Sequence, residues 1–200
     1  MKYTIYSDLH WGQVSQIRLG ITPKKGDFFI GDIFDIKNTS KKIIKQQLAA
    51  QASFNSACRL IGAHVLLGNH DLLPDDLGAV ERLNERISFS SPARHIVDGD
   101  VLFTHGHYIA WDQSQIDQWK AKKPNGVGFF RGITLAGENL YTRGIWKPSQ
   151  VELDRCFILA SSLSCKTIVF GHTHTEKTVD IEYKGIRIVN VGRGMTQIEL

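Results

Sequence analysis

The stretch "VFGHTHT", residues 169 to 175, places a glycine and two histidines directly after an apolar run. Within a strand, His172 and His174 would share one face, where two unpaired imidazoles would be costly to bury. In a loop just past the strand end, the two side chains can instead point toward a common object. The nature of that object depends on matching partners elsewhere in the chain.

Four other apolar runs end in the same way, with polar residues directly after the last apolar position. Their composition and length predict short strands that feed polar loops. The four runs are MKYTIYSD at 1–8, DFFIGD at 27–32, HVLLGNHD at 64–71 and VLFTHGH at 101–107. Five predicted strands therefore end in residues that can ligate a metal.

Helices are predicted between these strands. Residues 40–60 and 149–163 combine good helix formers with apolar positions at helical spacing, and Ser149 with Glu152 forms a capping-box pattern. Residues 75–84 predict a shorter helix, and residues 112–140 predict helix in part. The segments TVDIEYKG, IRIVNVG and MTQIEL alternate in polarity, which predicts an antiparallel meander near the end of the chain.

Strands that alternate with helices, followed by a run of strands, predict a layered α/β domain. Loops at the strand ends gather at one edge of such a domain, where ligands bind in open α/β sheets. A length of 200 residues fits one domain rather than two. We therefore expect a single domain over residues 1–200, with the five polar strand ends meeting at one edge.

Composition indicates a globular protein, with 42% hydrophobic and 22% charged residues and no apolar run long enough to cross a bilayer. Residues 1–8 read directly into a strand, without the pattern of a secretory signal. Cys58, Cys156 and Cys165 lie far apart in apolar or helical contexts, which favours reduced thiols over disulfides. These features together predict a cytoplasmic protein.

The net charge of +4 favours anionic partners such as phosphate groups. Basic and aromatic residues interleave over residues 119–147, where Lys120, Arg131 and Arg143 are candidate substrate-binding cations. A solvated helical face explains such charges equally well. Nucleic acid is therefore an alternative partner beside a phosphorylated small molecule or nucleotide, and the oligomeric state stays open.

The five strand ends together offer imidazole nitrogens, carboxylate oxygens and one amide oxygen, but no thiolate. This donor set suits Mn, Fe, Zn or Ni better than a structural zinc or a calcium cage. Seven ligands are too many for one catalytic ion, but they fit two divalent ions that share a carboxylate and clamp a phosphoryl group. The candidate ligands are Asp8, His10, Asp32, Asn69, His105, His172 and His174.

The ordered series SDLHWG, GDIFD, GNHD, THGH and GHTH resembles the motifs of the calcineurin-like metallophosphoesterase superfamily. The resemblance implies a four-layer αββα sandwich of two mixed β-sheets flanked by helices. The stretch after THGH is similar to the insert of the UDP-2,3-diacylglucosamine pyrophosphatase branch, which implies a small helical cap-like insert at about 110–147. The likeness to that branch is partial, because Lys37 stands where its Trp is usual.

The resemblance also implies a division of the ligands between two metals, with Mn²⁺ preferred. Asp32 would bridge both ions. The first ion takes Asp8, His10, Asp32 and His174, and the second takes Asp32, Asn69, His105 and His172.

By the same resemblance, His70 contacts substrate and protonates the leaving oxygen, and Asp71 orients His70. An imidazole held by a carboxylate is a suitable proton donor near neutral pH. Asp35 is either a carboxylate behind the ligands or a solvated one. His107 either touches substrate or forms a supporting hydrogen bond.

The function implied is hydrolysis of a phosphoester, most readily a phosphodiester or pyrophosphate, by a metal-bridging hydroxide with a histidine general acid. The alternatives are a nuclease, a phosphomonoesterase or protein phosphatase, and a non-catalytic binding module. Retention of His70 favours an enzyme over a binding module.

Overall fold

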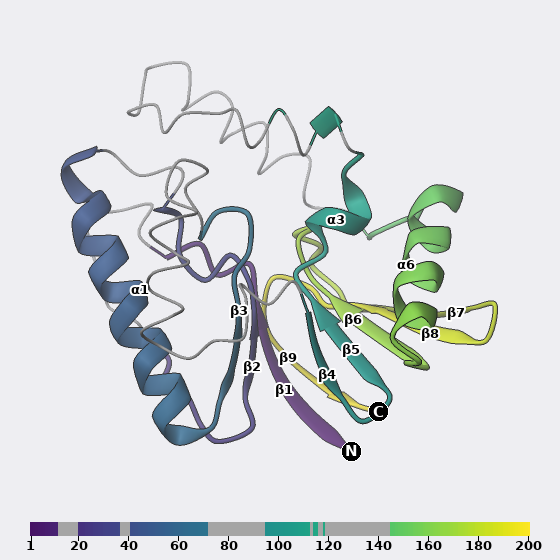
Figure 1. Cartoon of the computed structure of the whole chain (residues 1–200), viewed down its shortest axis with the longest axis horizontal. Helices are drawn as coiled ribbons and strands as arrows, with labels where there is room; N and C mark the ends of the chain where they lie inside the picture. The colour runs from purple at the N-terminus through teal and green to yellow at the C-terminus, as the bar shows by residue number, and fades with distance from the viewer. Residues whose placement is uncertain (12–19, 37–40, 72–94, 113, 116–117, 119–144) are drawn as a thin grey trace.

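The computed structural model describes residues 1–11, 20–36, 41–71, 95–112, 114–115, 118 and 145–200. Two β-sheets lie against each other, with one long helix on the outer side of each (Figure 1). The described helices are α1 (Lys41–Ile61), α3 (His107–Ala110) and α6 (Gln150–Ser162).

The first sheet has the strand order β3-β2-β1-β9, and only the β1–β9 pair is antiparallel. The second sheet has the order β4-β5-β6-β8-β7, with antiparallel pairs at its two edges. Both sheets are therefore mixed. The strands are β1 (Lys2–Ser7), β2 (Phe28–Ile30), β3 (His64–Leu66), β4 (His95–Asp98), β5 (Val101–Thr104), β6 (Thr167–Phe170), β7 (Val179–Tyr183), β8 (Ile186–Asn190) and β9 (Gly194–Glu199).

Alternation along the strands produces the layers. Ile30 of β2 faces the inter-sheet core with Phe103 of β5, whereas the neighbouring Phe29 faces α1 and packs with Phe54. The second sheet follows the same rule, since Ile168 of β6 faces outward with residues of α6. Because successive side chains of a strand point to opposite faces, each apolar strand serves two layers. The predicted four-layer αββα arrangement is confirmed.

The sequence explains both long helices, α6 by its capping box and α1 by its apolar face. α6 begins at a complete capping box, in which Glu152 N donates to Ser149 Oγ and Ser149 N donates to Glu152 Oε2 at 2.8 Å. α1 buries Phe54 and Cys58 against the first sheet. Both helices lie within one residue of the predicted ranges at each end.

The predicted C-terminal meander is wrong in its third strand. β7 and β8 form the expected hairpin, but β9 leaves that sheet and pairs with β1 in the other one. Alternation in β9 specifies which side chains are buried, such as the partly buried Ile198, but it does not specify the neighbouring strand. β4 was not predicted, and it pairs antiparallel with β5.

Other expectations are met or lie outside the described residues. All three cysteines are free, buried thiols. The predicted helix at 75–84 and most of the cap-like insert at 110–147 lie outside the described residues, and the insert stays a prediction. No described helix combines the length and apolar character that a membrane span requires.

Candidate metal centre

The polar residues that follow β1, β2, β3, β5 and β6 meet where the two sheets adjoin. The strands β1, β2 and β3 run parallel in one sheet, and β5 and β6 run parallel in the other. Their carboxyl ends therefore lie at one edge, as the sequence predicts. All seven candidate ligands are within the described residues and come together there in two overlapping clusters.

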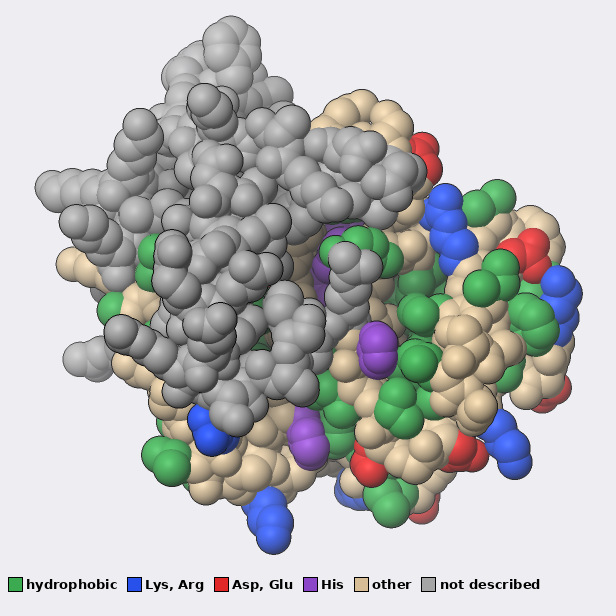
Figure 2. All heavy atoms as spheres, in the orientation of Figure 1, with side chains coloured by type: hydrophobic (Ala, Val, Ile, Leu, Met, Phe, Trp, Pro, Cys, Tyr) green, Lys and Arg blue, Asp and Glu red, His purple; other side chains and the backbone are tan. Residues whose placement is uncertain are grey.

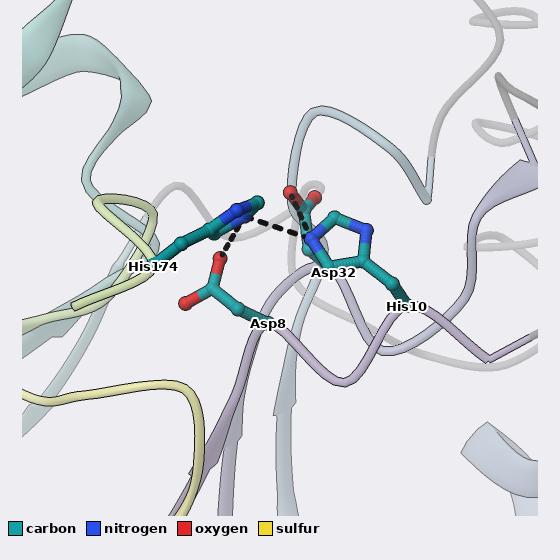
Figure 3. A group of neighbouring side chains, drawn as sticks. All are labelled: Asp8, His10, Asp32 and His174. Carbon is teal, nitrogen blue, oxygen red and sulfur yellow. Dashed lines mark hydrogen bonds and ion pairs between the residues drawn. The ribbon is translucent and has the colours of Figure 1, made fainter. Parts of the chain in front are cut away.

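The first cluster consists of Asp8, His10, Asp32 and His174, whose donor atoms all lie within 4.8 Å of one another. Figure 3 shows these four side chains converging from three loops. His174 Nε2 lies 3.2 Å from Asp8 Oδ1 and 2.8 Å from His10 Nε2. His10 Nε2 lies 3.8 Å from Asp32 Oδ2. Nitrogens and carboxylate oxygens thus face a common point.

The second cluster contains Asp32, His105 and His172, again within 4.8 Å of one another. His105 Nε2 lies 3.2 Å from Asp32 Oδ2 and 3.0 Å from Asn69 Oδ1. His172 Nδ1 lies 3.2 Å from His105 Nε2. Since Asp32 belongs to both clusters, its carboxylate is placed to bridge two ions.

The burial of two carboxylate oxygens is a further indication that the donor set fits divalent metals. Asp8 Oδ1 and Asp32 Oδ2 are buried, and each lies 3.2 Å from a histidine Nε2 without a well-aligned hydrogen bond from a described residue. Buried oxygens of this kind are costly unless a cation occupies the space between them. Imidazole and carboxylate donors without thiolate suit transition-metal ions that keep an open coordination position.

The protonation of the ligands is mostly that of a metal-binding state. Burial lowers the pKa of His10 to about 4 and that of His172 to about 3, so both rings are neutral at pH 7. Burial opposes ionisation of Asp32, but the positive charge on His105 holds the pKa of Asp32 well below its usual value. For His105 itself, burial is outweighed by the Asp32 and Asp8 carboxylates, which raise its pKa to about 9.

Five of the candidate ligands have left-handed backbone conformations, with φ between 49° and 73°. Residues other than Gly rarely adopt this region, and each such residue costs roughly 1–3 kcal/mol unless its surroundings enforce it. Concentration of this strain in the ligand loops indicates a functional geometry. The five are Asp8, His10, Asp32, His172 and His174.

Close backbone approach at Gly68 helps to place the bridge. A Cβ at position 68 would overlap the carboxylate and the backbone nitrogen of Asp32. His70 N donates to Asp32 Oδ1 at 2.7 Å, which fixes the other carboxylate oxygen. Only glycine at position 68 lets the two loops meet this closely.

The side chain of His70 lies beside the first cluster, with its ring 4.7 Å from that of His10 between centroids. Its Nδ1 is 2.7 Å from Oδ1 of the buried Asp35. The imidazole side chain is 18% exposed, so a solute can reach it. The carboxylate that positions His70 is therefore Asp35, one of whose two predicted roles was support of this kind.

The expected contact of Asp71 with His70 is corrected by the structure. The Asp71 carboxylate accepts hydrogen bonds from the backbone N–H groups of Phe34 at 2.6 Å, Gly68 at 2.9 Å and Ile33 at 3.3 Å. Burial and the Asp32 charge raise the pKa of Asp71 to about 7. Asp71 therefore ties the β2 and β3 loops together.

His107, the first residue of α3, is buried beside the second cluster. Its ring centroid lies 5.4 Å from that of His105, 6.1 Å from that of His172 and 4.0 Å from that of Tyr108. A role in substrate binding stays a prediction. Lys120, Arg131 and Arg143, the other candidate substrate-binding residues, lie outside the described residues.

Several supporting residues were missed in the sequence. Ser7 Oγ donates to Asp8 Oδ2, although Ser7 was read only as the end of a strand. Thr173 and Thr175 donate to Asn190 Oδ1 at 2.9 and 3.3 Å. Thr173 and Thr175 lie in a loop past β6, where no periodic pattern specifies which side chains face inward, so the sequence carries no clear signal for these contacts.

Comparisons with known proteins agree with this geometry. Residues 1–176 match the family of calcineurin-like phosphoesterases. The chain therefore belongs to the calcineurin-like phosphoesterase family, a class of metal-dependent hydrolases. The comparison with curated proteins found no match.

Solved structures with similarity to the chain include the following three. A cold-active protein-tyrosine phosphatase of a psychrophilic Shewanella species is 16% identical, with a TM-score of 0.44 and coverage of 99% of this chain and 75% of that one. A conserved uncharacterized protein of Streptococcus pneumoniae, a predicted phosphoesterase, is 16% identical, with a TM-score of 0.37 and coverage of 96% and 74%. A single mutant of Vps29 from Entamoeba histolytica is 15% identical, with a TM-score of 0.41 and coverage of 96% and 74%. The family assignment rests on the match over residues 1–176.

Proposed function

We propose that this chain hydrolyses a phosphodiester or pyrophosphate bond with two divalent metal ions and with His70 as general acid. Mn²⁺ is the metal that we expect first. The observation that carries the proposal is the position of Asp32 in both ligand clusters, directly beside an accessible histidine held by a buried carboxylate. Two such ions, when bound, supply charge for the phosphoryl oxygens and acidify a water.

The ligand residues have separate tasks in this proposal. Asp8, His10 and His174 would hold one ion, and Asn69, His105 and His172 would hold the other. Asp32 would contribute to both sites, because it lies in both clusters. Because the backbone of His172 also donates to Asp8 Oδ2 at 2.9 Å, the two sets are mechanically linked and keep a fixed spacing.

His70 supplies the proton in this proposal. Its Nδ1 faces Asp35, which selects the tautomer and stabilises positive charge on the ring. The second ring nitrogen, Nε2, would donate a proton to the leaving oxygen. This departure step needs a proton where the leaving group is an alkoxide, because an alkoxide is strongly basic.

The experiment compares bis-p-nitrophenyl phosphate with p-nitrophenyl phosphate, after chelation and re-addition of Mn²⁺. We expect turnover of at least one substrate that requires the metal. For a phosphodiester with an alkyl leaving group, whose departing oxygen needs a proton, the variant His70→Ala should lower kcat by on the order of a hundredfold or more while metal content is unchanged. Wild-type turnover in this variant would remove His70 from the mechanism, and silence of a metal-loaded wild type on both substrates would favour the binding-module alternative.

The nuclease alternative is tested in the same way with single-stranded and double-stranded DNA. On the face shown in Figure 2, the Lys and Arg side chains of the described residues are scattered around the margin, without a continuous stripe between them. Binding of extended nucleic acid usually needs such a stripe. Preference for DNA over both small substrates would overturn the small-molecule proposal.

A further inference from the structure

The loop between β8 and β9 touches two of the ligand loops, and it lies beyond residue 176, where the family match ends. Arg193 N donates to the carbonyl of Thr175 at 2.9 Å. Arg193 Nε donates to the carbonyl of Asp8 at 3.1 Å. A Cβ on Gly192 would lie 2.8 Å from Thr175 O, so this loop packs tightly against the histidine loop. Arg193 is thus held at the metal centre by two separate contacts.

The guanidinium of Arg193 is anchored at one end only. Arg193 is exposed, and its two terminal nitrogens, Nη1 and Nη2, have no hydrogen bond or ion pair with any described residue. Two other arginines differ in this respect. Arg187 pairs with Asp180 through Nε and Nη2, and Arg155 Nη1 donates to the carbonyls of Ile109 and Trp111. A fixed guanidinium with open donors beside a candidate phosphate-hydrolysing site has the chemistry of an anion ligand.

We propose that Arg193 binds the substrate phosphate and favours substrates with a second negative charge near the scissile bond. This inference rests on the proposed function of the same site. A simple phosphodiester carries one charge, whereas a phosphomonoester dianion and a pyrophosphate carry more. The open donors of Arg193 would contact the additional anionic oxygens, and the Nε anchor limits the conformational entropy lost on binding.

A merely structural role for Arg193 makes a different prediction. If the guanidinium only fastened the Asp8 loop, its removal would weaken metal binding and would slow every substrate by the same factor. A substrate-binding role lowers kcat/KM selectively for the more highly charged substrate. Metal content and the ratio between substrates therefore separate the two roles.

The test compares wild type, Arg193→Gln and Arg193→Lys in the Mn²⁺-loaded protein. Arg187→Gln is the matched control, because it removes an arginine that is paired with Asp180 instead. We expect Arg193→Gln to lower kcat/KM for p-nitrophenyl phosphate by about 10- to 100-fold. The loss for bis-p-nitrophenyl phosphate should be at least about tenfold smaller, with both metals retained. Arg193→Lys should keep more monoester activity than Arg193→Gln, and the control should match wild type.

A binding measurement keeps this inference separate from the proposed activity. Calorimetric titration with inorganic phosphate and with dimethyl phosphate needs no turnover. Weaker binding of phosphate but not of dimethyl phosphate in Arg193→Gln would support Arg193 even if no substrate were hydrolysed. ADP-ribose serves as the pyrophosphate probe, and its relative losses identify which doubly charged class is preferred. Equal losses for all ligands, or loss of metal in Arg193→Gln, would overturn the inference.

Discussion

Charge at the metal centre is distributed unevenly among its residues. His10 and His172 are neutral, the two ligand carboxylates are ionised, and His105 carries a proton that it must release before it can ligate a metal. In the metal-free protein this proton takes the place of a cation between Asp8 and Asp32. If the second cluster binds a metal ion as proposed, the ion would replace the proton on His105.

The exchange predicts a pH dependence for the metal-free protein. The pKa of His105 is about 9 in the folded state and near 6.5 when unfolded, so its stabilising effect is complete below pH 6.5 and is lost as pH rises through 9. The loss is on the order of 3 kcal/mol. Scanning calorimetry of the chelated protein from pH 6.5 to 9 should show a falling Tm. The Mn²⁺-loaded protein is the control, and a flat profile without metal would contradict the assignment.

The shared carboxylate predicts the consequence of a single substitution. Asp32→Asn removes one charged oxygen from both clusters, so we expect it to reduce occupancy by both ions rather than by one. Elemental analysis of the purified protein measures this directly. Asp35→Asn is the matched control with both ions retained, and a fully loaded Asp32→Asn protein would disprove the bridge.

Asp35 and Asp71 are expected to fail in different ways. Asp35→Asn weakens the support of His70, and we expect kcat to fall by about tenfold or more with little change in Tm. Asp71→Asn disturbs a carboxylate that accepts three backbone N–H groups, so it should lower the free energy of unfolding by about 1–3 kcal/mol. Steady-state kinetics and calorimetry on both variants decide the matter. A purely kinetic effect of Asp71→Asn would restore its predicted role beside His70.

At the scale of the elements, the strands position the loops that carry the candidate ligands, and the left-handed backbone of these loops orients the side chains. β1, β2, β3, β5 and β6 each end in a buried residue, and the candidate ligands follow one to four residues later. Short loops at strand ends can hold unfavourable backbone angles because the sheets on both sides fix their ends. The helices contribute by covering the outer faces, without supplying ligands among the described residues.

Because the helices cover the sheets and supply no candidate ligand among the described residues, we expect a change at a helix cap to alter the free energy of unfolding but not kcat. Ser149→Ala removes the side-chain acceptor at the start of α6 and should cost about 1 kcal/mol, or roughly 2–4 °C in Tm. Metal content and kcat should be unchanged. Ser162→Ala, at the other end of α6, is the control and should shift Tm less. A change of kcat in Ser149→Ala would show that α6 is coupled to the site.

At the scale of the whole molecule, sequence periodicity predicted a layered α/β domain, and the family resemblance implied its four layers. The strand-end motifs predicted which polar side chains gather at one edge, and the structure brings those side chains together, while their role as metal ligands stays a prediction. The partner of β9 escaped prediction because alternation is the same in either sheet. The resemblance implied that Asp71 orients His70, but in the structure the Asp71 carboxylate accepts backbone N–H groups, including that of Gly68. For Asp35 the sequence left two roles open, and the structure places its carboxylate against His70. Arg193 was missed because its contacts are with residues far away in the chain.

The pairing of β1 with β9 has a consequence for how the chain acquires its structure. Lys2 pairs with Glu199 and Ser7 with Gly194, so the two labelled chain ends lie side by side (Figure 1). Of the nine described strands, the earliest to leave the ribosome must wait for the last one before its edge is covered. Contacts of such long sequence separation slow folding. Assembly of this sheet during synthesis is therefore completed only after translation has passed residue 199, with Asp8 and His174 already made.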